Sequence, residues 1–166
     1  MNLTQQDQEK IISFLGKNEK AYYNPKVGEM MTTKILVIEP SKTLADALEI
    51  MVKEGFKSIP VVDKSTNQLL GVITDRDLRT YCKSIFNYTL KEVMDTLAQH
   101  KISDILPPFH LCQKVKEDTL INESAKILKQ VNINCLPVVT NDNQLSGVIT
   151  RSDMLDHLIR ILEPLE

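Results

Sequence analysis

The stretch NQLLGVITDRDL, residues 67–78, recurs later in the chain as NQLSGVITRSDM, residues 143–154. Seven of the eight positions from Asn67 to Thr74 are identical in the second copy. Both copies end in the spacing Thr-x-x-Asp, formed by Thr74 and Asp77 and again by Thr150 and Asp153. Two copies are too few for a solenoid, so the duplication predicts two equivalent units that bury a shared face.

The repeat extends upstream of these stretches. A Pro-Val-Val segment precedes each of them, at residues 60–62 and 137–139. In the first copy, residues 35–38 are apolar and predict a short strand. Apolar residues from Leu44 to Val52 then follow at spacings of three and four, which predicts one face of a helix. Ser41 or Thr43 can cap that helix, and Gly55 is placed to end it.

Two strands follow the helix in each copy, at residues 58–62 and 69–74 and again at residues 135–139 and 145–150. The loop between them is short and polar, which predicts an antiparallel hairpin. A helix follows each hairpin, so each copy has the predicted order β-α-β-β-α. We divide the chain into an N-terminal helical extension (1–26), repeat one (27–84), a linker helix (85–100) and repeat two (101–162).

Composition excludes several classes of protein. Of 166 residues, 42% are hydrophobic and 25% are charged, which is typical of a globular domain. The formal charge of −2 provides no basic excess for nucleic acid, and no apolar run is long enough to cross a membrane. The polar N-terminus is not that of a signal peptide. Three scattered cysteines without CxxC spacing indicate a reducing environment, so we expect a cytoplasmic protein.

The sequence carries none of the motifs on which common catalytic sites depend. It has no P-loop, no GxGxxG after a strand, no HExxH, no paired CxxC and no GxSxG elbow. We therefore expect no catalytic residues, no metal site and no required cofactor. An enzyme or a nucleic-acid binder is the weakest of the three hypotheses considered below.

The combination of motifs resembles a known family. A hydrophobic-Pro-Val-Val strand followed by Gly-hydrophobic-Ile-Thr-x-x-Asp, present twice over residues 27–160, is similar to a tandem pair of CBS domains, called a Bateman module. The resemblance implies an α+β fold in which the two repeats pack through their sheets with pseudo-twofold symmetry. It also implies two clefts for an adenosine-containing ligand (AMP, ADP, ATP or S-adenosylmethionine), and a homodimer.

The resemblance assigns the phosphoribose of such a ligand to Thr74 and Asp77 in one copy, and to Thr150 and Asp153 in the other. A helix N-terminus favours phosphate, and a carboxylate can accept hydrogen bonds from both ribose hydroxyls. The alternative is a capping box, in which the acid satisfies backbone N–H groups at the helix start. Both roles can coexist in one residue.

Arg76 and Arg151 lie within the two motifs, where a guanidinium group suits phosphate. The alternative is a surface arginine that pairs with Asp75 or Asp156. Asp75 adds negative charge beside the first motif and disfavours a triphosphate there.

An apolar slot for adenine is implied by the resemblance, built from the segments before the first strand and before Pro-Val-Val. The first copy offers Thr33, Ile35, Lys57, Ile59 and Pro60. The second offers His110, Asn134, Leu136 and Pro137. The alternative is that the apolar members are core residues and that His110 is a surface or core residue.

Two functional hypotheses carry the most weight. In the first, a regulatory module senses an adenosine ligand by conformational change and passes the signal to an unidentified effector protein. In the second, the module mediates protein interaction or dimerisation and its clefts are vestigial. Intact Thr-x-x-Asp spacing in both copies favours the first hypothesis.

Overall fold

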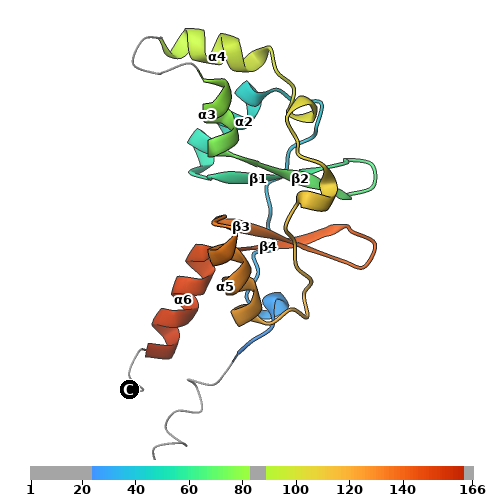
Figure 1. The fold of residues 1–166 in the computed structure, drawn as a ribbon, viewed down its shortest axis with the longest axis vertical. Coiled ribbons are helices and arrows are strands. Elements are labelled where there is room, and N and C mark those ends of the chain that lie inside the picture. Colours follow the sequence, from blue (N-terminus) through green and yellow to red (C-terminus); the bar gives the residue numbers. More distant parts are fainter. Residues whose placement is uncertain (1–23, 83–88, 163–166) are drawn as a thin grey trace, which may run out of the picture.

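A computed structural model describes residues 24–82 and 89–162, so the predicted N-terminal helical extension (1–26) lies outside them except for residues 24–26. Two small antiparallel sheets lie next to each other at the centre, and helices cover the outer side of each (Figure 1). The predicted α+β fold, with two repeats packed through their sheets, is confirmed.

The elements follow the duplication. The first repeat contains α2 (Leu44–Glu54), β1 (Ser58–Val62), β2 (Leu69–Thr74) and α3 (Asp75–Tyr81). The second repeat contains α5 (Ile121–Gln130), β3 (Cys135–Val139), β4 (Leu145–Thr150) and α6 (Arg151–Leu162). Helix α4 (Leu90–Ala98) lies between the repeats. The short 3-10 helix η2 (Val27–Glu29) begins the first repeat, and the 3-10 helices η3 (Ile102–Asp104) and η4 (Phe109–Leu111) begin the second.

Helix α2 begins and ends where the sequence predicts. The Thr43 hydroxyl accepts from the Asp46 backbone N–H at 3.1 Å, and Asp46 Oδ2 accepts from the Thr43 backbone N–H at 2.8 Å. The Thr43 hydroxyl also donates to Asp46 Oδ2 at 2.8 Å, and the backbone N–H and hydroxyl donors together hold the pKa of the Asp46 carboxyl below its ordinary value. Gly55 ends the helix at φ 73°, a left-handed conformation that favours glycine.

Val52 does not belong to the buried face of α2, contrary to the prediction. It is 74% exposed, whereas the neighbouring Met51 is 5% exposed. One residue turns an α-helix by about 100°, so the position after a buried residue points away from the core. The buried residues of α2 are Leu44, Ala45, Ala47 and Met51.

Both predicted hairpins are present with the same register. Ser58 pairs with Thr74 in the first, and Cys135 pairs with Thr150 in the second. Burial alternates along β2 and β4, because successive residues of a strand point to opposite faces.

The predicted strand at residues 35–38 is wrong. Only Ile38 pairs there, through a parallel bridge in which its N–H donates to Pro60 O and its carbonyl accepts from Val62 N–H. The next ladder bond would require an N–H on Pro60, and proline has none. The second repeat has the same arrangement at Val115, whose N–H donates to Pro137 O. The two prolines therefore limit each segment to a single bridge.

The first segments of the two repeats, η2 and η3, are exchanged. The backbone N–H of Val27, in η2, donates to Thr119 O, and Val27 is buried in the core of the second repeat. The backbone N–H of Ile102, in η3, donates to Lys42 O, and Ile102 is buried in the core of the first repeat. Each core thus includes a segment that belongs in sequence to the other repeat.

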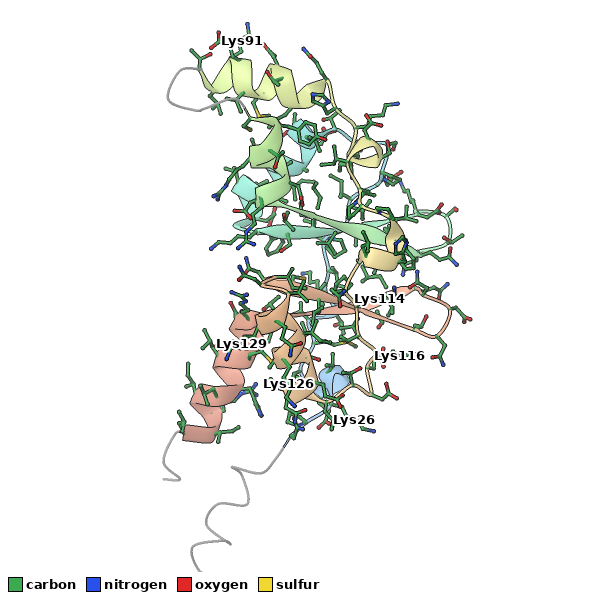
Figure 2. All side chains as sticks on the ribbon, in the orientation of Figure 1. Lys26, Lys91, Lys114, Lys116, Lys126 and Lys129 are labelled. Carbon is green, nitrogen blue, oxygen red and sulfur yellow. The ribbon has the colours of Figure 1, made fainter. Side chains whose placement is uncertain are left out.

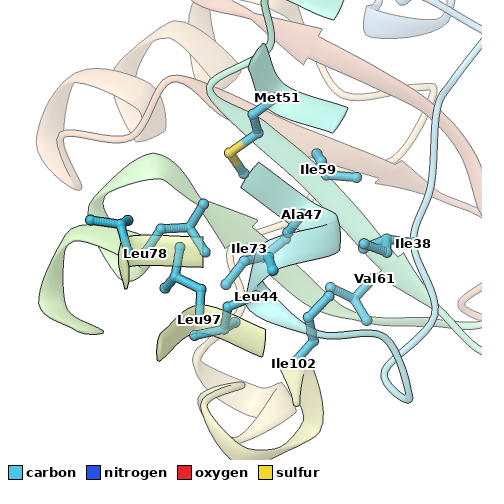
Figure 3. Close-up of a cluster of buried hydrophobic side chains, with 12 residues drawn as sticks. Ile38, Leu44, Ala47, Met51, Ile59, Val61, Ile73, Leu78, Leu97 and Ile102 are labelled. Carbon is cyan, nitrogen blue, oxygen red and sulfur yellow. The ribbon is translucent and has the colours of Figure 1, made fainter. Parts of the chain in front are cut away.

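The first repeat has the larger core (Figure 3). The predicted linker helix is present as α4, and it packs on this repeat through Val93 and Leu97. Leu44, Leu97 and Ile102, from three different elements, lie together in the cluster and are fully buried.

The identical stretches contact each other at the hairpin turns. Asn67 Nδ2 donates to Leu145 O at 3.0 Å, and Asn143 Nδ2 donates to Leu69 O at 3.1 Å. The backbone repeats this symmetry, because Leu69 N–H donates to Asn143 O and Leu145 N–H donates to Asn67 O. Beneath these bonds, Val62, Leu69, Val139 and Leu145 form a small buried cluster between the repeats. A twofold contact needs the same residue on both sides, which explains why the stretch is written twice.

We expect Asn67→Ala and Asn143→Ala each to lower the free energy of unfolding by about 1–2 kcal/mol, measured by urea denaturation. Each removes a hydrogen bond, worth ~0.5–1.5 kcal/mol, and forces alanine into the left-handed region. Asn67→Gly is the matched control, because it loses the hydrogen bond without backbone strain and should cost less. Alanine variants as stable as the wild type would show that the turns do not hold the repeats together.

Candidate functional site

Two clefts open between the repeats. The Thr74 cleft, about 200 Å³, is lined by Lys57, Ser58, Val72, Thr74, Asp75, Arg76, Pro107, Leu111, Cys112, Gln113, Val131, Asn132, Ile133, Asn134 and Cys135. The Thr150 cleft, about 540 Å³, is lined by Thr32, Lys34, Ile35, Leu36, Gly55, Phe56, Lys57, Ser58, Pro60, Asn134, Cys135, Val148, Thr150, Arg151, Ser152 and Asp153.

Each cleft is built from both repeats. The sequence groups the threonine motif and the slot segments by copy, but the structure combines them across copies. Thr74 lies with residues 111–113 and 131–135, whereas Thr150 lies with residues 34–36 and 55–58. Because the hairpins are related by a pseudo-twofold axis, the end of one faces the start of the other. A ligand in either cleft would contact both repeats.

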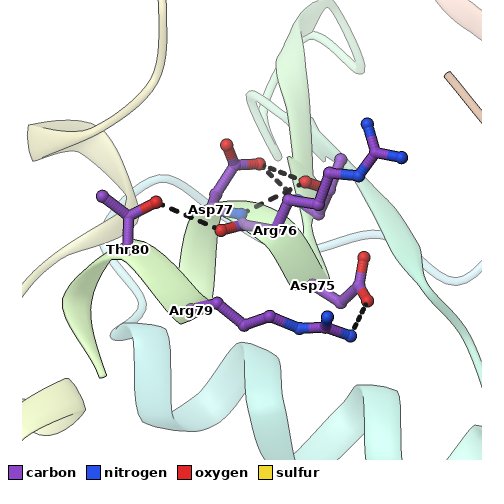
Figure 4. Close-up of polar contacts among 6 residues, drawn as sticks. Asp75, Arg76, Asp77, Arg79 and Thr80 are labelled. Carbon is purple, nitrogen blue, oxygen red and sulfur yellow. Dashed lines mark hydrogen bonds and ion pairs between the residues drawn. The ribbon is translucent and has the colours of Figure 1, made fainter. Parts of the chain in front are cut away.

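Both Thr-x-x-Asp motifs form capping boxes. Asp77 Oδ2 accepts from the Thr74 backbone N–H at 2.7 Å and from the Thr74 hydroxyl at 2.6 Å (Figure 4). Asp153 Oδ2 accepts from the same two groups of Thr150, both at 2.7 Å. In return, the backbone N–H of each aspartate donates to the threonine hydroxyl of its own motif at 3.3 Å. The capping alternative is therefore realised at both sites.

The two motifs differ in how they face their clefts. Thr150 and Asp153 both line the Thr150 cleft. Thr74 lines the Thr74 cleft, but Asp77 is not among its lining residues. Of the two capping aspartates, only Asp153 therefore lies on a cleft wall.

The two arginines meet at one residue rather than forming the surface ion pairs considered from the sequence. Arg76 Nη1 donates to Asn132 O at 3.2 Å. Arg151 Nη2 donates to Asn132 Oδ1 at 2.9 Å and to Leu128 O at 3.0 Å. Asp75 instead pairs with Arg79, at 2.7 Å between Oδ2 and Nη2.

The other predicted site residues divide into two groups. Ile35, Lys57, Pro60 and Asn134 line a cleft. The remaining five do not line either cleft: Thr33, Ile59, His110, Leu136 and Pro137.

Ile59 and Leu136 are fully buried and belong to the two repeat cores, as the alternative interpretation held. Alternation along a strand explains the placement, because Ser58 and Pro60 face the cleft side and Ile59 faces the core. His110 lies in η4 on the exposed surface.

The sequence analysis did not single out Lys34, Asn132 or Cys135, all of which line a cleft. A closer superposition of the repeats contains the signal for Asn132. It stands where Gly55 stands in the first copy and shares its left-handed backbone, at φ 57°. Cys135 occupies the position of Ser58 at the start of the hairpin.

Burial raises the pKa of the Cys135 thiol to about 12, and the nearby Asp153 carboxylate and Cys112 add to the effect. Burial also raises the pKa of Cys112. Both thiols are therefore protonated near neutral pH and are poor nucleophiles. No group of three or more His, Cys, Asp or Glu side chains in the described ranges is arranged to hold a metal ion.

Two α+β repeats that share two composite clefts define a class, that of paired-repeat modules with sites between the repeats. A family model described as CBS domain matches residues 27–84 and 112–160. The chain belongs to the CBS domain family. Within residues 24–82 and 89–162, no helix has the length and apolar character needed to cross a membrane.

Three relatives show how the family uses this module. A CBS domain-containing protein of Dictyostelium discoideum is 34% identical over 139 residues, covering 83% of this chain and 94% of the relative. A crystal structure of CBSX2 in complex with AMP has a TM-score of 0.69 at 27% identity, covering 84% of this chain and 99% of that one. The inosine-5'-monophosphate dehydrogenase of Methanocaldococcus jannaschii is 28% identical over 130 residues, which cover 78% of this chain but 23% of the enzyme.

We expect Cys135 in the native protein to react with iodoacetamide at pH 8 at least about a hundredfold more slowly than in urea. The raised pKa leaves almost no thiolate at that pH, whereas the unfolded thiol has its ordinary pKa near ~8.5. Mass spectrometry of the labelled peptides measures the rates. Equal labelling in the native and unfolded protein would contradict the protonated, shielded thiol.

Proposed function

We propose that the protein is a regulatory module that senses an adenosine-containing ligand and responds by a change in the arrangement of its repeats. The composite build of the clefts is the observation that carries this proposal. Lining residues from both repeats surround each cleft, so the affinity for a ligand depends on how the repeats are placed. A ligand shifts such an equilibrium by its differential affinity for the two arrangements.

The chemistry of the Thr150 cleft suits an adenosine ligand. Ile35, Leu36, Phe56 and Val148 supply apolar surface for the base. Asp153 uses Oδ2 for the helix cap, and its second carboxylate oxygen accepts no hydrogen bond from the described residues. That oxygen is available for ribose hydroxyls. The AMP complex of CBSX2, a structure with 27% identity to this chain, supports the same ligand class.

Regulation without catalysis fits the site better than an enzyme does. The cleft thiols are held protonated, and the two acids that line the clefts are engaged, Asp153 in a helix cap and Asp75 in an ion pair with Arg79. The match to the dehydrogenase covers less than a quarter of that enzyme, so it transfers no activity to this chain. An effector protein that receives the signal, and a cytoplasmic location, stay predictions.

Nucleic acid is a poor fit to the surface. Of the lysines labelled in Figure 2, Lys91 lies on α4, Lys126 and Lys129 lie on α5, and Lys26, Lys114 and Lys116 lie on segments beside the second repeat, while the formal charge of the chain is −2. Two of them are engaged locally. Lys114 lies 3.9 Å from the centre of the Phe109 ring, and Lys116 Nζ donates to Asn141 Oδ1 at 2.6 Å.

A homodimer is favoured by α6. No described residue of this helix is buried, although Leu155, Leu158, Ile159 and Leu162 are apolar and about half exposed or more. Their spacing of three and four places them on one face of the helix. We propose that two chains pair through this face, which would be the main function if the clefts were vestigial.

A thermal-shift panel tests the sensor. AMP, ADP, ATP with and without magnesium, S-adenosylmethionine and adenosine are compared, with GMP as the control. A ligand at 100 times its dissociation constant stabilises the native state by ~2.7 kcal/mol, and each kcal/mol raises Tm by ~2–4 °C. We expect a shift of several degrees for at least one adenosine ligand and none for GMP. If none of them raises Tm, the hypothesis of a protein-interaction or dimerisation module is favoured over the sensor.

Substitution on α6 tests the dimer. We expect Leu158→Lys combined with Ile159→Lys to convert a dimer into a monomer in analytical ultracentrifugation, because charges would be buried in an apolar contact. Arg160→Glu, on the opposite face of the same helix, is the control and should leave the mass unchanged. A double variant that still sediments as a dimer would place the interface elsewhere.

A further inference from the structure

The two clefts occupy equivalent positions of the two repeats, but they differ in charge. The residue after the threonine begins the helix in both. It is Arg151 in the Thr150 cleft and Asp75 in the Thr74 cleft. Their backbones are equivalent, since Arg151 N–H donates to Asn134 O at 3.1 Å and Asp75 N–H donates to Lys57 O at 3.0 Å. This position therefore presents a cation in the Thr150 cleft and, in the Thr74 cleft, a carboxylate that pairs with Arg79 and lies next to the cation of Arg76.

Lys34 strengthens the difference, whereas Lys57 and its equivalent Asn134 border both clefts, so that Lys57 supplies a cation common to the two. Lys34 lines the Thr150 cleft, and its equivalent in the second repeat is Leu111. Neither lysine forms an ion pair with a described residue. Both ammonium groups are thus available to a ligand anion.

One nitrogen of the Arg151 guanidinium group is anchored, and the others are available to such an anion. Nη2 is anchored by Leu128 O and Asn132 Oδ1, and within the described residues the other guanidinium nitrogens make no hydrogen bond. A guanidinium group has five N–H donors in a rigid plane, so anchoring one nitrogen orients the rest.

In the Thr74 cleft, the Arg76 guanidinium group forms a hydrogen bond across the cleft. It follows Asp75 where Ser152 follows Arg151, and its Nη1 reaches from α3 to Asn132 O in the other repeat. Both residues line the Thr74 cleft, so this hydrogen bond spans it. The Thr74 cleft has a volume of about 200 Å³, against about 540 Å³ for the Thr150 cleft, and its lining includes the Asp75 carboxylate, which pairs with Arg79 at 2.7 Å.

We propose that the chain binds one phosphorylated adenosine ligand, in the Thr150 cleft, with Lys34, Lys57 and Arg151 around its phosphate groups. The Thr74 cleft is closed to phosphate by Asp75 and by the contact between Arg76 and Asn132. This inference rests on the proposed sensor function and adds to it the choice of cleft and the need for phosphate.

Isothermal titration calorimetry with AMP, ADP and adenosine tests the choice of cleft. We expect one site per chain for the nucleotide that binds best. Arg151→Ala and Lys34→Ala should each weaken that nucleotide by about 10- to 100-fold, as expected for a lost charged hydrogen bond, and weaken adenosine by less than about threefold. Lys53→Ala, an exposed lysine outside both clefts, is the control and should bind as the wild type does.

A reciprocal exchange of the two positions sharpens the test. Asp75→Arg with Arg76→Ser gives the Thr74 cleft the residues of the other motif, and we expect a second binding event. Arg151→Asp with Ser152→Arg should abolish nucleotide binding. Circular dichroism confirms that each variant is folded, and either variant alone is decisive if the other fails to fold.

The outcomes separate the two proposals. Two equal sites in the wild type, or nucleotide binding that survives Arg151→Ala and the Arg151→Asp/Ser152→Arg exchange, would overturn the choice of cleft and leave the sensor intact. If the Asp75→Arg/Arg76→Ser protein gains no second site, positions 75 and 76 do not determine which cleft binds the nucleotide. A wild-type protein that binds none of these three compounds, and neither ATP nor S-adenosylmethionine, would overturn the sensor itself.

Discussion

The contact between the two hairpin turns is the constraint on which the remaining structure depends. Asn67 and Asn143 each adopt a left-handed backbone and each donate a side-chain hydrogen bond across the axis. This arrangement sets the two sheets against each other around the small apolar cluster between them. It also places the end of each hairpin beside the start of the other, which creates the clefts. The two similar stretches of sequence thereby produce two clefts at equivalent positions.

The elements of the fold were largely predictable, because their signals are local. Apolar spacing, Thr43 and Gly55 define α2, and the short polar loops define the hairpins, whose strand bounds agree with the prediction. The strand expected at residues 35–38 failed for a reason that the sequence contains. Pro60 interrupts the ladder of its neighbour, and that effect becomes visible only when the pairing partner is known. The exchanged packing of η2 and η3 is a tertiary property with no local signal.

The site was less predictable than the fold. The threonine motifs were found because they are repeated, and both do begin helices. Grouping the lining residues by copy failed, since each cleft combines the two copies. Ile59 could not be separated from Ser58 and Pro60 without the orientation of the strand. The shared position of Asn132 between Arg76 and Arg151 also required the three-dimensional arrangement.

Because η2 and η3 are exchanged, the duplicated unit of the sequence differs from the unit that packs as one core. The unit that was duplicated is a continuous stretch of sequence, but the unit that packs as one core is discontinuous. Val27 fills the core of the second repeat and Ile102 fills that of the first. A polypeptide cut between the repeats would yield two halves, each carrying a piece of the other. Neither half would contain a complete core, so each repeat depends on the other for its packing.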